Sequence, residues 1–533
     1  MKEKEYDIRK VAEKLSLSED NLILYGNDKA KIDISSLSSS SKKGKLILCT
    51  AITPTKAGEG KTTTAIGLAD GLTSIGEKAL VCLREPSLGP VFGVKGGGAG
   101  GGEATLYPED DINLHFTGDM HAITSANNLI AALVDNEVYQ NSELNIDPDN
   151  IIFPRCLDMN DRALRSITTS LDDKKCSPHH AGFVITAASE VMAIFAISKD
   201  EEDFLNRIDN ITVAYTKDGK PVFAKQLQCR NAIYKLMHQA LYPNLVQSKY
   251  HTPALVHGGP FANIAHGTNT VIATNLALNL ADYVVTEAGF GSDLGMEKYM
   301  DIVCPNASLT PDAVVLVCSI RALKLHGGVK FEDLKNENVE AVKIGLANLA
   351  HHIENVKAFG VPLIVGINQF NDDTQAELKV VFDYLDSLSI PYSLNSAFKD
   401  GPDGAKDLAK KVIAQLKTAE NHYKPIVDSS MSIEEKIETI SKKIYGAKDV
   451  EYAPFILEQI QKYKDMGYNS FNVCMSKTPN SLSDDQSLLN DPKDHTIHIK
   501  NIRLFTGARF IVPLTGSVLT MPGLPKVPAS KKM

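Results

Sequence analysis

The sequence predicts an α/β protein whose centre is a doubly wound, mostly parallel sheet carrying a variant phosphate-binding loop. Two observations support this fold class. From Lys45 onward, short runs of β-branched residues alternate with helical stretches, as in parallel strands joined by crossover helices. A glycine-rich segment also lies between the first of these runs and a helical pattern. A length of 533 residues is enough for more than one domain.

The predicted elements begin with an amphipathic helix in residues 7–26 and a Ser-rich connector at 35–45. The predicted strands are short apolar runs at 45–53, 78–83, 182–187, 211–215, 254–257, 283–286, 313–319 and 362–368. After residue 391 the chain becomes charged and helical, with its clearest helices at 429–445 and 452–468. Short strands return around Val473, Ile497 and Phe510. We expect a main domain over 1–310, a smaller α/β domain over 311–418 and a C-terminal α+β domain over 419–533.

The amino-acid composition indicates which kinds of binding partner the protein is expected to lack. The net charge of −9 and the lack of basic clusters interleaved with aromatics disfavour nucleic acid. The eight cysteines form no C-x-x-C pair, and Cys49 and Cys82 lie in apolar runs, where cysteine behaves as a small hydrophobe. Neither a signal peptide nor a run of membrane-spanning length is present. We therefore expect a cytoplasmic protein with no membrane partner.

The glycine-rich segment reads Thr53-Pro-Thr-Lys-Ala-Gly-Glu-Gly-Lys-Thr-Thr-Thr64. Its backbone N–H groups would face an anion, Lys61 would add a positive charge, and the Thr62 hydroxyl would ligate Mg²⁺. The strict Walker pattern has glycine where Thr55 stands, so this loop is a variant. A simple polar turn is the alternative, but the strand before the loop and the helix after it favour nucleotide binding. The predicted nucleotide contacts are Thr55, Lys56, Ala57, Gly58, Glu59, Gly60, Lys61 and Thr62.

Ligands of open α/β sheets bind beyond the carboxyl ends of the strands, so the segments that follow predicted strands matter most. Arg84 follows one strand, and its guanidinium would either stabilise a phosphoryl or acyl-phosphate anion or form a salt bridge with a carboxylate such as Glu85. Segments 257–267 and 287–295 also follow strands and exceed ordinary turn composition. The glycine run at 95–102 is either a tether or a place of close approach to a ligand.

Two other kinds of chemistry are disfavoured. His115, Asp119 and His121 lie at short spacing, but a zinc or iron site needs further protein ligands that the sequence does not offer. A polar segment facing a substrate is the better interpretation. No Gly-x-Ser-x-Gly elbow or Cys–His pair indicates covalent acyl-enzyme chemistry.

Taken together and in this order, the segments resemble the formate–tetrahydrofolate ligase family over nearly the whole chain. Two blocks are the most specific, Arg84-Glu-Pro-Ser-Leu-Gly-Pro-Val-Phe-Gly93 and His257-Gly-Gly-Pro-Phe-Ala-Asn-Ile-Ala-His266. The matching blocks are 53–64, 84–102, 111–132, 257–266, 282–298, 321–328 and 514–525.

The resemblance implies that formate attacks the γ-phosphate of MgATP to give formyl phosphate, which the N10 amine of tetrahydrofolate then attacks. Lys61 and the loop amides would hold the phosphates, Thr62 the Mg²⁺, and Arg84 formate and then formyl phosphate. The folate would stack between Phe370 and Phe398, which the domain over 311–418 contributes. The resemblance also implies a homotetramer and activation by K⁺ or NH₄⁺.

Three departures from the family pattern are visible. Phe398 stands where the family commonly has tryptophan, so less ring area is available for stacking. Lys56 replaces a residue that is more often uncharged, and the sequence ends somewhat early. A truncated or alternative C-terminus is one interpretation of that end.

A rival interpretation starts from Lys56, because the deviant Walker loop of dimerising partition and iron-protein ATPases carries an early lysine there. Such a protein would be a nucleotide-switched ATPase rather than a ligase. Those ATPases are typically half this length and lack the blocks at 257–266 and 287–295. A catalytically silent relative is a third possibility, against which the presence of Lys61, Thr62 and Arg84 speaks.

Overall fold

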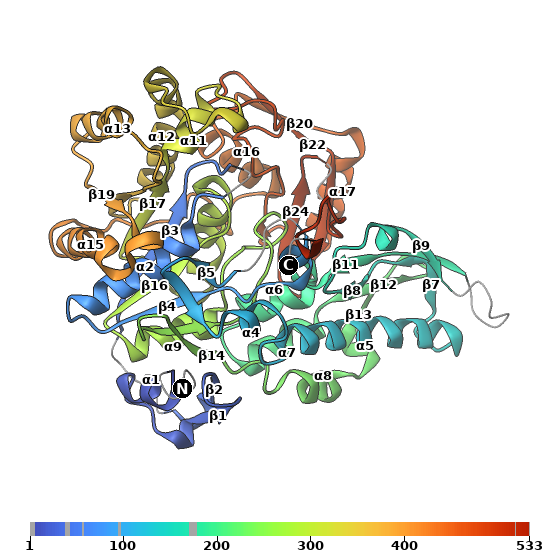
Figure 1. Ribbon diagram of the computed structural model, residues 1–533. Coiled ribbons are helices and arrows are strands. Elements are labelled where there is room, and N and C mark those ends of the chain that lie inside the picture. The colour runs from blue at the N-terminus through green and yellow to red at the C-terminus, as the bar shows by residue number, and fades with distance from the viewer. Residues whose placement is uncertain are drawn as a thin grey trace.

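The computed structural model describes residues 6–37, 43–55, 58–93, 98–169, 178–516 and 519–531. Its centre is a twelve-stranded sheet (Figure 1) in the order β1-β2-β14-β15-β4-β16-β3-β17-β18-β19, with β6 beside β14 and β5 beside β6. The strands are β1 (Leu22–Leu24), β2 (Ala30–Ile32), β3 (Lys45–Ala51), β4 (Ala79–Leu83), β5 (Gly100–Gly101), β6 (Ala104–Tyr107), β14 (Asn244–Ser248), β15 (Pro253–Val256), β16 (Tyr283–Glu287), β17 (Ala313–Cys318), β18 (Leu363–Asn368) and β19 (Tyr392–Asn395).

Every pairing along the sheet order from β15 to β19 is parallel. The central strand β3 lies between β16 and β17. On one side the strands follow in chain order as β17, β18 and β19, and on the other side β16 separates β3 from β4. Antiparallel pairings of β14, β2 and β1 extend one edge of the sheet. The predicted doubly wound, mostly parallel sheet is confirmed.

Helices cover both faces of the sheet, which explains why its strands read as continuous apolar runs. In β3, Leu46 and Leu48 face one core, whereas Ile47 and Cys49 face the other. Helices α9 (Val271–Leu280), α11 (Ile320–His326) and α12 (Val339–Ala358) contribute to the first core. Helices α2 (Lys61–Ser74) and α15 (Lys406–Thr418) contribute to the second.

Two predicted strands lie outside the central sheet, which corrects the sequence interpretation. The run at 182–187 forms β11 (Phe183–Ile185), which pairs with β8 (Arg155–Leu157). The run at 211–215 forms β12 (Thr212–Thr216), which pairs antiparallel with β7 (Ile146–Ile151) and β13 (Pro221–Phe223). These strands belong to a lobe, residues 144–169 and 178–223, that extends to the right in Figure 1 beside α5 (Asp119–Tyr139) and α8 (Arg230–Met237). Local apolar patterning identifies a strand but not its partner.

The N-terminal helix is shorter than predicted. Helix α1 covers only Ile8–Lys14, and Ser16 has a left-handed backbone with φ 63°. The following residues turn and enter β1, which pairs with β2 at the edge of the sheet. The apolar positions continue past Lys14, and for that reason the periodicity suggested a longer helix.

The C-terminal region contains both predicted helices, as α16 (Ile433–Lys443) and α17 (Pro454–Asp465). Its strands are β20 (Asp449–Tyr452), β21 (Asn472–Val473), β22 (Thr496–Ile499), β23 (Asn501–Phe505) and β24 (Phe510–Leu514). The division into three domains stays a prediction, and β17, β18 and β19 are hydrogen-bonded into the same sheet as β3.

None of the described helices has the length and apolar character needed to cross a membrane. The remaining elements are β9 (Ile167–Thr169), β10 (His179–Ala181), α3 (Leu88–Phe92), α4 (Glu109–Asn113), α6 (Glu190–Ile197), α7 (Glu201–Asp209), α10 (Cys304–Ala307), α13 (Gln375–Ser387) and α14 (Ala397–Asp400).

A buried carboxyl anchors the C-terminal region to the rest of the fold. Glu190, at the start of α6, accepts hydrogen bonds from the backbone N–H groups of Gly507 at 2.7 Å and Ala508 at 3.3 Å, in the turn between β23 and β24. Its side chain is 8% exposed. Burial raises the pKa of Glu190 to about 8, although the two backbone hydrogen bonds act in the opposite direction.

This pKa shift predicts a pH-dependent stability. The folded chain keeps the proton of Glu190 up to about pH 8, whereas the unfolded chain releases it near the ordinary glutamate pKa of about 4.3. The contribution of Glu190 is therefore complete below about pH 4.3 and is lost as the pH rises toward 8. A Glu190→Gln variant cannot ionise, so its Tm relative to wild type should increase steadily from pH 5 to pH 8. A constant Tm difference over that range would contradict the assignment.

Candidate active site

The predicted phosphate-binding loop joins β3 to α2. Gly58 and Gly60 have left-handed backbones, with φ +80° and +72°. Gly60 is also the N-cap of α2, and a Cβ at this position would lie 2.2 Å from Nδ2 of Asn368. Gly60 is thus required both by conformation and by packing. Lys56 and Ala57, two of the predicted nucleotide contacts, lie outside the described residues.

Glu59 holds this loop together. Its buried carboxylate accepts hydrogen bonds from the Thr55 N–H at 2.8 Å and from the Ser319 hydroxyl. The Glu59 carbonyl accepts a further bond from Asn368 Nδ2 at 3.0 Å. Side chains at the ends of β17 and β18 therefore fix the shape of the loop that follows β3.

A carboxylate at the end of β16 links the loop to Arg84. The Thr62 hydroxyl donates to Glu287 Oε2 at 2.8 Å, and Arg84 Nη2 lies 3.5 Å from Glu287 Oε1. Glu287 is 5% exposed. Because β3, β16 and β4 are neighbours in the sheet and all parallel, the residues that follow them meet at one edge.

The charges at this edge interact with one another. Burial lowers the pKa of Lys61, the negative charges of Glu287 and Glu59 oppose that change, and Arg84 adds to it. Arg84 Nε is buried and has no hydrogen-bond partner among the described residues. Of the two roles that the sequence left open for Arg84, the ion pair exists, but with Glu287 rather than Glu85. The guanidinium still has donors for an anion.

The two predicted folate-stacking residues also follow neighbouring strands. Phe370 comes after β18, and the Arg321 guanidinium lies over its ring at 4.0 Å from the centroid while pairing with Asp372 at 2.6 Å. Phe398 comes after β19 and is 57% exposed. A Cβ at Gly101 would lie 3.2 Å from the Phe398 ring. Phe398 is thus a surface aromatic against a glycine strand and not a core residue.

Sequence reasoning did not single out Glu287 or Arg321 as site residues. Both follow predicted strands and lie in segments that the sequence analysis marked, 287–295 and 321–328, but neither residue was assigned a role. Their partners are distant in the sequence, so no local pattern identifies the pairs Glu287–Arg84 and Arg321–Phe370.

Two predicted ligand-facing segments instead have structural contacts. His257 is fully buried between the Thr270 hydroxyl at 2.6 Å and the Ala240 carbonyl at 2.7 Å, and burial lowers its pKa to about 4. Asp119 is also buried and pairs with Lys31 at 2.7 Å rather than facing a substrate. No group of three or more His, Cys, Asp and Glu side chains among the described residues is arranged to hold a metal ion.

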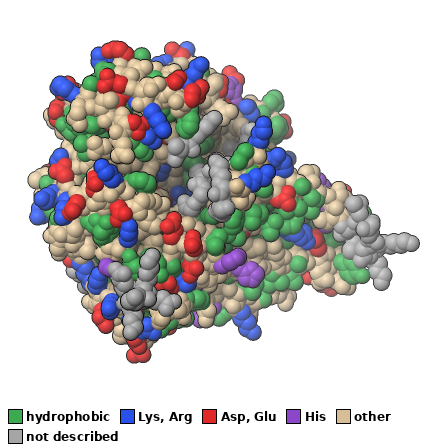
Figure 2. Space-filling model, in the orientation of Figure 1, with side chains coloured by type: hydrophobic (Ala, Val, Ile, Leu, Met, Phe, Trp, Pro, Cys, Tyr) green, Lys and Arg blue, Asp and Glu red, His purple; other side chains and the backbone are tan. Residues whose placement is uncertain are grey.

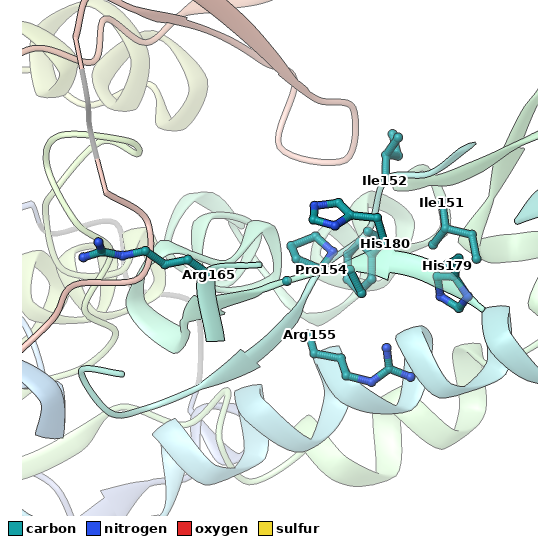
Figure 3. A pocket seen from close by; sticks show the side chains of 10 residues that line it. Ile151, Ile152, Pro154, Arg155, Arg165, His179 and His180 are labelled. Carbon is teal, nitrogen blue, oxygen red and sulfur yellow. The ribbon is translucent and has the colours of Figure 1, made fainter. Parts of the chain in front are cut away.

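A cavity of about 160 Å³ lies in the lobe and not at the carboxyl edge of the sheet (Figure 3). Its cationic side chains already have partners, since Arg155 pairs with Asp135 and Arg165 Nε donates to the Met521 carbonyl at 2.9 Å. In Figure 3 Arg165 points away from His179 and His180. The cavity is therefore not arranged as an anion site.

The phosphate loop, Glu287 and Arg84 meet at one edge of the sheet, and Phe370 follows a strand farther along that edge. Known proteins show which family has these features. A family model described as formate–tetrahydrofolate ligase matches residues 1–533. The chain belongs to the formate–tetrahydrofolate ligase family. Membership makes it an ATP-dependent ligase of one-carbon folate metabolism, which excludes the rival interpretation as a partition-type ATPase.

Curated relatives agree with this membership. The formate–tetrahydrofolate ligase of Granulibacter bethesdensis is 51% identical over 522 residues, covering 97% of this chain and 91% of the relative. That of Rhizobium meliloti is 50% identical over 529 residues, covering 99% of this chain and 95% of the relative.

Solved structures show only a distant likeness. A plasmid partition protein of Borrelia burgdorferi is 14% identical, with a TM-score of 0.24, covering 70% of this chain and all of that one. Cobyrinic acid a,c-diamide synthase of Mycobacterium smegmatis is 11% identical, with a TM-score of 0.23, covering 71% and 97%. Scores this low support no conclusion about the ligase.

Proposed function

We propose that the chain joins formate to tetrahydrofolate through formyl phosphate. A formate oxygen attacks the γ-phosphorus of ATP, and the bond from that phosphorus to the bridging oxygen of ADP breaks. The N10 amine then attacks the formyl carbon, phosphate leaves, and the amine loses its proton. The observation that carries this proposal is the Thr62–Glu287–Arg84 contact, which places a second cation beside the predicted nucleotide loop.

Phosphoryl transfer depends mainly on positioning and on charge neutralisation. The loop from Thr55 to Thr62 would hold the ATP phosphates at the N-terminus of α2, where backbone N–H groups and the helix dipole favour an anion. Lys61 would neutralise phosphate charge. Glu59 would contribute through its backbone and by keeping the loop closed, because its carboxylate is already bonded to Thr55 and Ser319.

The site also fits Mg²⁺. This cation prefers oxygen ligands and is usually held by one or two protein groups together with water and phosphate oxygens. The Thr62 hydroxyl and the Glu287 carboxylate are such groups, 2.8 Å apart at the base of the loop. When bound, Mg²⁺ would neutralise phosphate charge. Glu287 also contacts the hydroxyl of Thr62 and the guanidinium of Arg84.

Arg84 would bind formate and later the formyl phosphate anion. A guanidinium offers several donors in one plane and stays charged at any working pH. Glu287 would fix its orientation from one side and leave the remaining N–H groups for the substrate. In this arrangement the acceptor of the phosphoryl group would lie next to the loop that would hold the donor.

Tetrahydrofolate would stack on Phe370 and Phe398. The exposed ring of Phe398 offers a free face, and Arg321 supports the ring of Phe370 from one side. Both residues follow strands at the edge of the sheet where the phosphate loop lies.

The size of the ring at position 398 should set folate affinity. Phe398→Ala should raise KM for tetrahydrofolate by roughly tenfold, because an aromatic contact contributes about 0.5–1.5 kcal/mol beyond its area. Phe398→Trp should lower that KM below the wild-type value, since tryptophan offers a larger stacking surface. KM for ATP should stay constant in both variants. A tetrahydrofolate KM insensitive to both changes would place the folate elsewhere.

The function is tested by measuring 10-formyltetrahydrofolate formation with ATP, formate and tetrahydrofolate omitted in turn. Product that requires all three supports the overall reaction. The intermediate needs a separate test, in which ATP labelled with ¹⁸O in the β–γ bridge is incubated with formate but no folate. Formate-dependent scrambling of the label into non-bridging positions would support formyl phosphate. Product formation without any scrambling would favour a concerted route.

A homotetramer, activation by K⁺ or NH₄⁺, and a cytoplasmic location also belong to this proposal. One surface feature supports self-association. Hydrophobic side chains gather over the lobe and the C-terminal segment in Figure 2, and large exposed apolar patches are typical of interaction sites. Among the large apolar side chains of these two parts of the chain, Ile152, Leu157, Leu519 and Leu524 are 39–47% exposed.

A further inference from the structure

The first residue of the phosphate loop is held by side chains from two helices. Thr53 is fully buried, and its N–H donates to Asn348 Oδ1 at 3.3 Å. Its hydroxyl accepts from Asn348 Nδ2 at 3.0 Å and bonds His352 Nε2 at 2.9 Å. Its carbonyl is 3.0 Å from His326 Nε2. Every polar group of Thr53 is therefore bonded to a side chain of α11 or α12.

His352 connects Thr53 to the segment that follows β16. While its Nε2 bonds Thr53, its Nδ1 bonds the Ser292 hydroxyl at 2.7 Å. Ser292 is the first residue of a short π-helix, Ser292–Met296, in the segment that follows β16, the strand that ends at Glu287. The ring is fully buried, and burial lowers the pKa of His352 to about 3, so it stays neutral. A neutral imidazole donates from one nitrogen and accepts at the other, which suits a bridge between two hydroxyls.

The helix that carries His352 is in turn anchored by the C-terminal region. The side-chain amide of Asn490 inserts into α12: its Oδ1 accepts from the Asn348 N–H at 2.9 Å and its Nδ2 donates to the Ile344 carbonyl at 2.9 Å. The backbone N–H of Asn490 donates to His326 Nδ1 at 3.0 Å. Since a backbone N–H can only donate, His326 must carry its proton on Nε2 and donate it to Thr53.

We propose that His352 is a positioning residue for the nucleotide. By bonding Thr53 and Ser292 at the same time, it fixes the position of the phosphate loop relative to the segment after β16. Lys61 and Thr62 are thereby held at a fixed position relative to Glu287. Asn490 anchors the helix on which this bridge stands. The inference rests on the proposed role of the phosphate loop in binding ATP. It assigns a function to a histidine that the sequence pattern does not distinguish from its neighbour His351.

Two substitutions of His352 each remove one of the two hydrogen bonds of the bridge. The amide of glutamine reaches the place of a histidine Nε2, whereas the shorter asparagine reaches only that of Nδ1. His352→Gln should therefore keep the bond to Thr53 but lose the bond to Ser292, so the bridge is broken and the KM for ATP should rise roughly tenfold. His352→Asn should lose that bond and raise the KM for ATP roughly tenfold, with KM for tetrahydrofolate unchanged. A KM for ATP that stays at the wild-type value in both variants would overturn the proposal.

The neighbouring histidine provides the matched control. His351 lies on the same helix and bonds Asp491 at 2.9 Å and the Ile444 carbonyl at 2.8 Å, away from the phosphate loop and the segment after β16. His351→Gln should lower Tm and leave the KM for ATP unchanged. An equal rise in that KM would mean that any damage to α12 has this effect, and would overturn the special role of His352.

Direct titration with a non-hydrolysable ATP analogue distinguishes failure of the inference from failure of the proposed function. If Lys61→Ala binds the analogue as wild type does, the loop does not hold ATP and the proposed function fails first. If Lys61→Ala loses binding while both His352 variants keep it, only the inference fails. Should a His352 variant not fold, Asn490→Gly replaces it, because glycine tolerates the φ of 67° at that position and removes the side chain that bonds α12. That variant should bind the analogue more weakly, and unchanged binding would overturn the proposal.

Discussion

Replacing Arg84 with alanine should abolish formation of 10-formyltetrahydrofolate while leaving ATP binding largely intact. The guanidinium lies beside the predicted nucleotide loop but is not part of it, and among the described residues Glu287 contacts both. Removing a positioned donor for a developing anion typically costs about 10²–10³-fold in kcat. Here the same donors would also bind formate, so the loss should reach or exceed the upper end of that range.

The Arg84 variant is best measured in two assays side by side, product formation with all three substrates and titration with a non-hydrolysable ATP analogue. Arg84→Lys is the informative companion, because it keeps the charge but loses the planar fork of donors. We expect it to recover little activity. If Arg84→Ala loses ATP binding together with activity, Arg84 holds the nucleotide or the structure rather than formate.

The central sheet could be predicted from sequence because its strands are buried on both faces. In β3 and β17 every residue but the exposed Lys45 is buried, so each reads as an uninterrupted apolar run. The phosphate loop was predictable for a related reason. Its glycines and its lysine are contiguous, and the strand and helix that must flank it are themselves well marked.

Strands with polar residues were missed. Strand β14 reads Asn-Leu-Val-Gln-Ser and is buried throughout, with the Asn244 amide donating to Asp119 and to the Val256 carbonyl. Its polarity is explained only by partners that are distant in the chain. Two strands of the lobe, β11 and β12, were recognised but assigned to the wrong sheet, since apolar patterning carries no information on which strand pairs with which.

The candidate site was predicted in its parts but not in its connections. Lys61, Thr62 and Arg84 each follow a strand, and the rule that ligands bind beyond carboxyl ends was enough to select them. Glu287 joins them through contacts that depend on the neighbouring positions of β3, β16 and β4 in the sheet. Composition misled at His257, because a histidine in a glycine-rich loop resembles a ligand until its two buried partners are seen.

Lys61→Ala should differ from the Arg84 variant by losing ATP binding as well as activity, with kcat/KM for ATP falling roughly 10³-fold or more. The lysine stands at the start of α2, directly after Gly60, where the loop and the helix N-terminus would converge on the phosphates. Analogue titration is the measurement. Intact binding of the analogue by this variant would mean that the loop is not the nucleotide-binding site.

The pH dependence of the wild-type enzyme gives an independent check on Lys61. Burial lowers its pKa, so in the free enzyme it should begin to lose its proton below the ordinary lysine pKa of about 10.4. Only the protonated form can neutralise phosphate, so kcat/KM for ATP should decline on the alkaline side of the profile before an exposed lysine would titrate. In Lys61→Arg the residual activity should lack this decline, because a guanidinium stays charged over the same range. An alkaline limb that persists unchanged in that variant belongs to another group.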